Sequence, residues 1–115
     1  MAICKANAIK FKWDSGIQRL QHKIAEHALA AYTGNPNMIF LAFLVNITEL
    51  CDCVVGNQPA ITEDVGILIS RDPVAIDAAT LDLLNINIDK ESVKDQLEHA
   101  QKIGLGSRNY KLELI

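Results

Sequence analysis

Two spacings of hydrophobic residues alternate along the chain and predict its elements. Residues 8–13 alternate between hydrophobic side chains and lysines, which predicts a short strand. Residues 38–47 are almost continuously apolar and rich in β-forming residues. That pattern is typical of a strand buried on both faces, although a buried helix has the same pattern. Residues 65–69 and 110–115 are the third and fourth predicted strands.

Three segments have helical spacing. One lies between the first and second predicted strands, and two lie between the third and fourth. The first follows Asp14 or Ser15, either of which can cap a helix, and ends at the breakers of residues 34–36. The second starts at Asp72-Pro73, where Asp72 can cap the helix and Pro73 suits the first helical position, and it runs to about residue 84. The third spans about residues 91–103, and Gly104 is expected to end it. The alternation predicts a single α/β domain over residues 1–115, with three layers and a small, mostly parallel (mixed) sheet flanked by helices.

The composition narrows the class of protein. Half of the 115 residues are hydrophobic and 22% are charged, as in a globular domain. The net charge of -3 and the scattered basic residues argue against binding to nucleic acid. The longest apolar run is less than half of a membrane span. We therefore expect a cytoplasmic protein that binds neither nucleic acid nor membrane.

Two closely spaced cysteines are the first candidates for chemistry. Cys51 and Cys53 are too close for an easy mutual disulfide. In extended backbone both sulfurs point to one side and Asp52 points to the other. Two thiolates in this arrangement could share one soft metal ion. The alternative is that both are small hydrophobic residues at the end of a strand.

Two further aspartates lie near the predicted strand at residues 65–69. Asp64 comes just before this strand, after a long loop, and Asp72 follows it. If the strands that end near residues 47 and 69 are parallel, both ends lie at the same edge of the sheet, where open α/β sheets bind ligands. We therefore expect Cys51, Cys53, Asp64 and Asp72 to cluster in one cleft. In that cleft Asp52, like the other two aspartates, is an expected metal ligand or a nearby oxygen partner.

Asp77 is an unusual residue in the second predicted helix, because it falls on the apolar side. A carboxylate on a buried face needs a partner, and we expect it just beneath the helix start. Arg71 or a metal ion could serve, and so could backbone N–H groups of the first turns. Asp82 falls on the other side of the helix, which is expected to be solvated.

Three segments of the sequence carry a family resemblance: "VNITELCDC", "PAITEDVGILISRDPVAIDAATLDLL" and "EHAQKIGLGSRNYKLELI". Together they resemble the C-terminal part of the uncharacterised domain family 362, over nearly the whole chain. Members of that family often carry a bacterial-type ferredoxin insert with two [4Fe-4S] motifs. The family has no firmly assigned reaction. The resemblance therefore implies an association with iron–sulfur chemistry more than a particular activity.

The first residues strengthen this resemblance. "AICKANAIKFKW" resembles the tail of a ferredoxin motif, with Cys4 as the fourth cysteine and Lys5 in place of the usual proline. The resemblance implies that residues 1–13 are such a tail and that the chain is a fragment whose N-terminal half is absent. Cys4 could then hold a cluster only if the missing ferredoxin ligands completed it. No four-cysteine cluster is expected from this chain alone.

Three functions remain open at this point. The first is an iron–sulfur or single-metal domain of unknown activity, with Cys51 and Cys53 as ligands. The second is a non-catalytic structural or oligomerisation domain, which pairs with a second copy or with a separate N-terminal half. The third is a thiol-dependent enzyme with one of these cysteines as nucleophile, although no histidine lies near them in the sequence. Under each, we expect a homo-oligomer or a complex with the N-terminal half.

Overall fold

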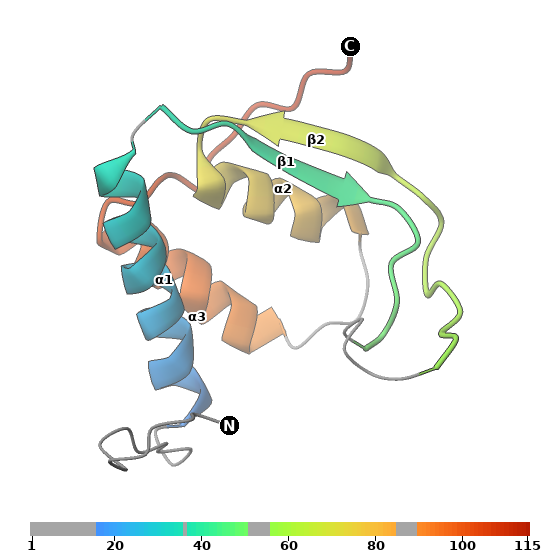
Figure 1. The fold of residues 1–115 in the computed structure, drawn as a ribbon, viewed down its shortest axis with the longest axis horizontal. Helices are drawn as coiled ribbons and strands as arrows, with labels where there is room; N and C mark the ends of the chain where they lie inside the picture. The colour runs from blue at the N-terminus through green and yellow to red at the C-terminus, as the bar shows by residue number, and fades with distance from the viewer. Residues whose placement is uncertain (1–15, 36, 51–55, 85–89) are drawn as a thin grey trace, which may run out of the picture.

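The fold is described by a computed structural model, drawn in Figure 1, in residues 16–35, 37–50, 56–84 and 90–115. The described chain holds three helices and two strands, so the mixed α/β class is confirmed. The predicted strand at residues 8–13 and the caps at Asp14 and Ser15 lie outside the described residues. In chain order the elements are α1 (Ile17–Gly34), β1 (Phe40–Leu44), β2 (Gly66–Ser70), α2 (Pro73–Leu84) and α3 (Lys90–Lys102).

The two strands form an antiparallel ladder, in which Phe40 lies opposite Ser70 and Leu44 lies opposite Gly66. The predicted parallel pairing of these two strands is therefore wrong. A parallel pair needs a crossover, usually a helix, between its strands. The described part of residues 45–65 contains no helix, and the bridge between Thr48 and Ala60 continues the antiparallel pairing beyond the strands. The chain thus turns back on itself after β1.

Only one face of this sheet is covered within the described chain. Helix α2 packs against both strands on that face, where Leu44 is 2% exposed. On the other face Leu41 and Phe43 of β1 and Ile67 and Ile69 of β2 are 59 to 64% exposed. The run at residues 38–47 therefore contains a strand, although it is shorter than predicted and is not buried on both faces.

The predicted fourth strand is absent. Residues 110–115 are exposed and form no ladder in the described chain, although residues 110–112 line a small pocket together with residues 68–70 of β2. The segment is held by a helix, because the Tyr110 hydroxyl donates a hydrogen bond of 2.6 Å to Asp82 Oδ2 on α2. Asp82 is exposed, as the sequence predicted.

The core lies among the helices, where α1 and α3 run side by side (Figure 1). Its buried residues come from all three helices and from the turn after α3. That turn uses Gly104, whose φ of 82° lies in the left-handed region, and Leu105 N–H donates back to the Ala100 carbonyl. Gly104 therefore ends α3 as predicted. The buried cluster consists of Ala25, Val74, Leu97, Ala100 and Leu105.

Candidate functional site

Asp72 caps helix α2, and both of its carboxylate oxygens accept backbone hydrogen bonds. Val74 N–H and Ala75 N–H donate to Oδ1 over 2.8 and 3.0 Å. Ser107 N–H donates to Oδ2 over 2.8 Å, from the segment that follows α3. The predicted cap is confirmed, and a second anchor is added to it. A metal ion at Asp72 would have to compete with these three bonds.

Gly106 lies directly against the same carboxylate. A β-carbon at this position would overlap the Asp72 side chain, with Oδ1 as the nearest atom. A glycine is therefore required for the segment after α3 to reach the start of α2. The sequence offers no local signal for this contact, because the two residues are far apart in the chain.

Asp64 fixes the turn at the opposite end of the ladder. Its Oδ1 accepts a hydrogen bond of 2.7 Å from Asn46 N–H, and Asn46 has a φ of 52°. Asparagine tolerates this left-handed conformation better than most residues. The ladder between Gly66 and Ser70 is about 14 Å long. Asp64 and Asp72 lie beyond its two ends, so they do not form the shared cleft that parallel strands implied.

Four of the predicted ligands lie in parts of the chain that the structure does not describe. Cys4, Cys51, Asp52 and Cys53 lie outside the described residues. Within the part of the chain that is described, no group of three or more histidine, cysteine, aspartate and glutamate side chains is arranged to hold a metal ion. The metal-binding roles of these residues stay predictions.

Asp77 lines a small recess among the three helices, with a volume of about 70 Å³. The carboxylate stands at the rim, partly exposed, and burial against the apolar walls raises the pKa of Asp77. Asp77 was expected on a buried face of α2, whereas its side chain is exposed at the rim of this recess. Arg71, the partner expected for it, is exposed and forms no ion pair in the described chain. The apolar walls come from Ile24, Ala25, Ala28, Pro73, Val74, Leu97, Ala100 and Leu105.

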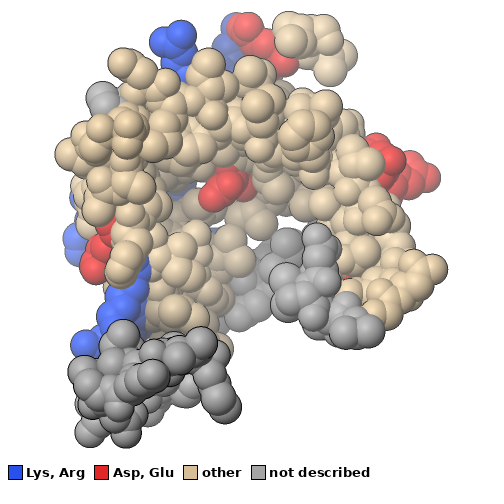
Figure 2. Space-filling view, viewed as in Figure 1, with Lys and Arg blue, Asp and Glu red and all other residues tan. Residues whose placement is uncertain are grey.

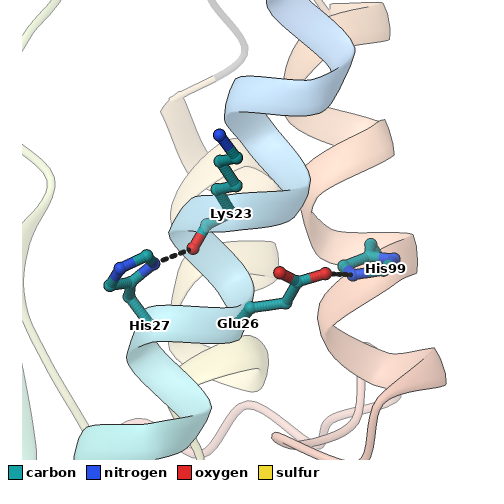
Figure 3. A network of polar contacts seen from close by, with 4 residues as sticks. All are labelled: Lys23, Glu26, His27 and His99. Carbon is teal, nitrogen blue, oxygen red and sulfur yellow. Dashed lines mark hydrogen bonds and ion pairs between the residues drawn. The ribbon is translucent and has the colours of Figure 1, made fainter. Parts of the chain in front are cut away.

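A second polar group joins α1 to α3. His22 and His99 stack with ring centroids 4.0 Å apart and planes 7° from parallel. Figure 3 shows Glu26 on α1 reaching the ring of His99, where Oε1 and Nε2 are 3.1 Å apart. His27 instead donates from Nδ1 to the Lys23 carbonyl on its own helix. Sequence spacing could not reveal the stack, because it joins two helices.

The face of the sheet that lies away from α2 exposes several large apolar side chains. Leu41 lies opposite Ile69, and Phe43 lies opposite Ile67, so the four side chains share one face. Figure 2 shows uncharged side chains over the region of the two strands, and charged groups mostly near the margins of the view. We define the open sheet face as Ile39, Leu41, Phe43, Val45, Val65, Ile67 and Ile69, which are 44 to 64% exposed.

The model of one known protein family matches most of the chain. Residues 2–82 match the model of a family described as Domain of unknown function (DUF362). The chain belongs to the DUF362 family. The resemblance noted from the sequence is thereby confirmed, and the family description assigns no reaction. No curated protein and no solved structure matches the chain.

The DUF362 match contains both strands and therefore the whole open sheet face. It ends within α2, so α3 and the Gly106 contact follow the matched residues. Among the described helices, none combines the length and apolar character that a membrane span requires. Among the candidate sites, the open sheet face is the best candidate for binding a partner, because its seven side chains are apolar and exposed.

Proposed function

We propose that this DUF362 chain is a non-catalytic assembly domain whose open sheet face packs against another protein layer. The supporting observation is the exposure of four apolar side chains on one face of the paired strands, together with three exposed apolar residues that flank the strands in the chain. Monomeric soluble proteins rarely expose apolar patches larger than a few hundred Å². A covering layer removes this surface from water, which is favourable in proportion to the area buried.

The proposal also agrees with the three-layer architecture that was expected from the sequence. Helix α2 covers one face of the sheet. With a second layer on the open sheet face, the sheet becomes the middle of three layers. Further strands beside the outer edges of β1 or β2 would extend the sheet toward the mixed arrangement expected from the sequence. The two outer edges have no strand neighbour within the described residues.

A lysine pair on the open sheet face tests the assembly role. The variant carries Phe43→Lys and Ile67→Lys, whose parent side chains are opposite each other and 64% and 60% exposed. Circular dichroism checks that it folds. We expect the wild-type chain either to associate or to bind an apolar fluorescent dye, and the variant to do neither. The matched control is Leu114→Lys, at a position 102% exposed in the terminal segment. Equal behaviour of all three proteins in mass and dye binding would contradict the proposal.

A second candidate function is metal or iron–sulfur association. It is supported by the thiol pair Cys51 and Cys53 within the residues matched by the family, and by the ferredoxin-like sequence around Cys4. The donor set fits a soft metal or an iron–sulfur cluster, because thiolates are the ligands these prefer. Asp72 fits less well, since its two oxygens already accept three backbone bonds.

Elemental analysis and a visible spectrum of protein purified without oxygen test this second candidate. We expect iron or another soft metal in the wild-type chain, and its loss in Cys51→Ser combined with Cys53→Ser. Asp64→Asn is the matched control and should retain the metal if the thiols alone hold it. Metal content that is absent, or equal in all three proteins, would contradict a site at the thiol pair.

A thiol-dependent enzyme is the third candidate and has the least support. The sequence contains the thiols, but two of its three histidines, His22 and His99, are stacked on each other between α1 and α3. An odd number of cysteines, which leaves at least one outside any disulfide within the chain, supports a cytoplasmic location, where thiols remain reduced. Stoichiometric alkylation with iodoacetamide, followed by loss of an activity, would be needed to favour the enzyme.

A further inference from the structure

We propose that the layer covering the open sheet face is the same face of a second copy of this chain, which forms a two-fold symmetric β-sandwich. The inference rests on the proposed assembly function and names its partner. A two-fold dimer uses one surface patch on both subunits, so the patch must complement itself in size, chemistry and charge.

The size of the open sheet face meets the first requirement. Its seven side chains retain between 44 and 64% of their accessible surface. Together they expose on the order of 700 Å², close to the ~800 Å² that each partner contributes to a standard-size interface. Two copies of this face are therefore large enough to form a stable dimer without other surfaces.

The chemistry of the face meets the second requirement. None of its seven residues is charged, so apposing two copies buries no pair of like charges. The centre is built from two cross-strand pairs, Leu41 with Ile69 and Phe43 with Ile67. Isoleucine, leucine and phenylalanine side chains on two sheet faces can interdigitate to form a sandwich core about 10 Å thick.

The charges at the ends of the ladder select one orientation. Arg71 follows β2 at one end, and Glu63 precedes β2 at the other; both are exposed. A two-fold axis across the strands reverses the direction of the second sheet. Arg71 of each copy then lies near Glu63 of the other copy, and two attractive pairs form at the rim. An axis along the strands would instead bring like charges together.

Light scattering over a concentration series tests the self-pairing. The wild-type chain is expected to have twice the chain mass of 12.7 kDa. The combined Phe43→Lys and Ile67→Lys variant is expected to be a folded monomer, and Leu114→Lys is expected to remain a dimer. A dimer that survives the lysine pair would overturn the inference, since its interface would lie elsewhere.

Charge exchange tests the orientation. Arg71→Glu alone and Glu63→Arg alone should each weaken dimerisation by about tenfold or more, because like charges meet twice at the rim. The combined Arg71→Glu and Glu63→Arg protein should regain most of the wild-type affinity. Weakening that the combined variant does not relieve would overturn this orientation.

Dye binding separates failure of this inference from failure of the assembly role. A wild-type monomer that binds the apolar dye, when the lysine-pair variant does not, would overturn the second copy as the partner. The assembly role would stand in that case, with another polypeptide such as the N-terminal half as the covering layer. A wild-type monomer that binds no dye would overturn both proposals.

Discussion

The two faces of the β1–β2 sheet carry similar side chains and have different environments. Leu44 points into the helix-covered side and is 2% exposed, whereas Leu41, three residues earlier, is 59% exposed. Both belong to the same apolar run. Hydrophobicity alone thus identified the strand, but it did not show which side α2 covers. An exposed apolar strand face of this kind is typical of an interaction surface, which is why the assembly proposal rests on it.

The same substitution on the two faces gives the largest expected contrast. Leu44→Ala removes a fully buried side chain from beneath α2 and should lower the free energy of unfolding by about 3 kcal/mol. Leu41→Ala, on the open sheet face, should lower it by less than about 0.5 kcal/mol in the monomer. Urea denaturation at a concentration where the chain is monomeric measures both. Equal losses would mean that the open sheet face is covered within the chain.

The ends of the ladder should differ in a similar way. Asp72→Ala removes the cap of α2 and the bond to Ser107, and should cost about 2 kcal/mol. Asp64→Ala removes one exposed bond to Asn46 N–H and should cost less than about 1 kcal/mol. Thermal unfolding followed by circular dichroism gives both values. A larger loss of stability for Asp64→Ala than for Asp72→Ala would mean that Asp64 is the more important structural anchor.

Gly106→Ala tests the contact between Asp72 and the segment that follows α3. The added methyl group overlaps the Asp72 carboxylate, and we expect a loss of about 1 to 2 kcal/mol. In the Asp72→Ala background the loss should shrink, because the obstructing oxygens are gone. Gly34→Ala is the control, since nothing lies within 4 Å of a β-carbon there. Additive losses in the double variant would contradict the contact.

Asp77 should give the smallest effect, and one that depends on pH. Burial raises its pKa in the folded chain, so the folded state binds more protons than the unfolded state between the unfolded value of 3.8 and the raised value. Stability therefore falls as pH rises through that window. Asp77→Asn should be more stable than wild type at neutral pH, by roughly 0.5 kcal/mol at this partly exposed site.

Below pH 3.8 this advantage of Asp77→Asn should disappear, because the carboxyl group is protonated in both states. Unfolding curves across the acidic range measure the change. Glu49→Gln, at an exposed carboxylate, is the matched control. An advantage that persisted at low pH would mean that the asparagine acts through packing instead of charge.

Local signals in the sequence account for the elements that were predicted correctly. Asp72 and Pro73 identify the start of α2, because a cap and a fixed φ act within one turn. Gly104 identifies the end of α3 in the same way. The apolar run at residues 38–47 contains β1, whose β-forming side chains suit a pleated sheet. Each of these features is decided by residues a few positions apart.

The features that could not be predicted depend on distant parts of the chain. The direction of β2 relative to β1 follows from the path of residues 45–65, which the period of hydrophobic residues does not report. His22 and His99 stack on each other, but they are far apart in the sequence, so the sequence gives no sign of this contact. The expected shared cleft of Asp64 and Asp72 was wrong for a simpler reason: the two residues flank opposite ends of β2, so they lie apart whichever way β2 pairs with β1. The thiol ligands remain untested.

The Asp72 anchor has a consequence for the order in which the chain folds. Its bonds to Val74 and Ala75 close within a single turn, so the start of α2 can form as soon as that segment leaves the ribosome. Its bond to Ser107 joins residues 35 positions apart and has to wait for α3. One oxygen thus serves an early local step and the other a late, long-range one. Loss of Oδ2 alone should leave helix nucleation intact and accelerate detachment of the C-terminal segment.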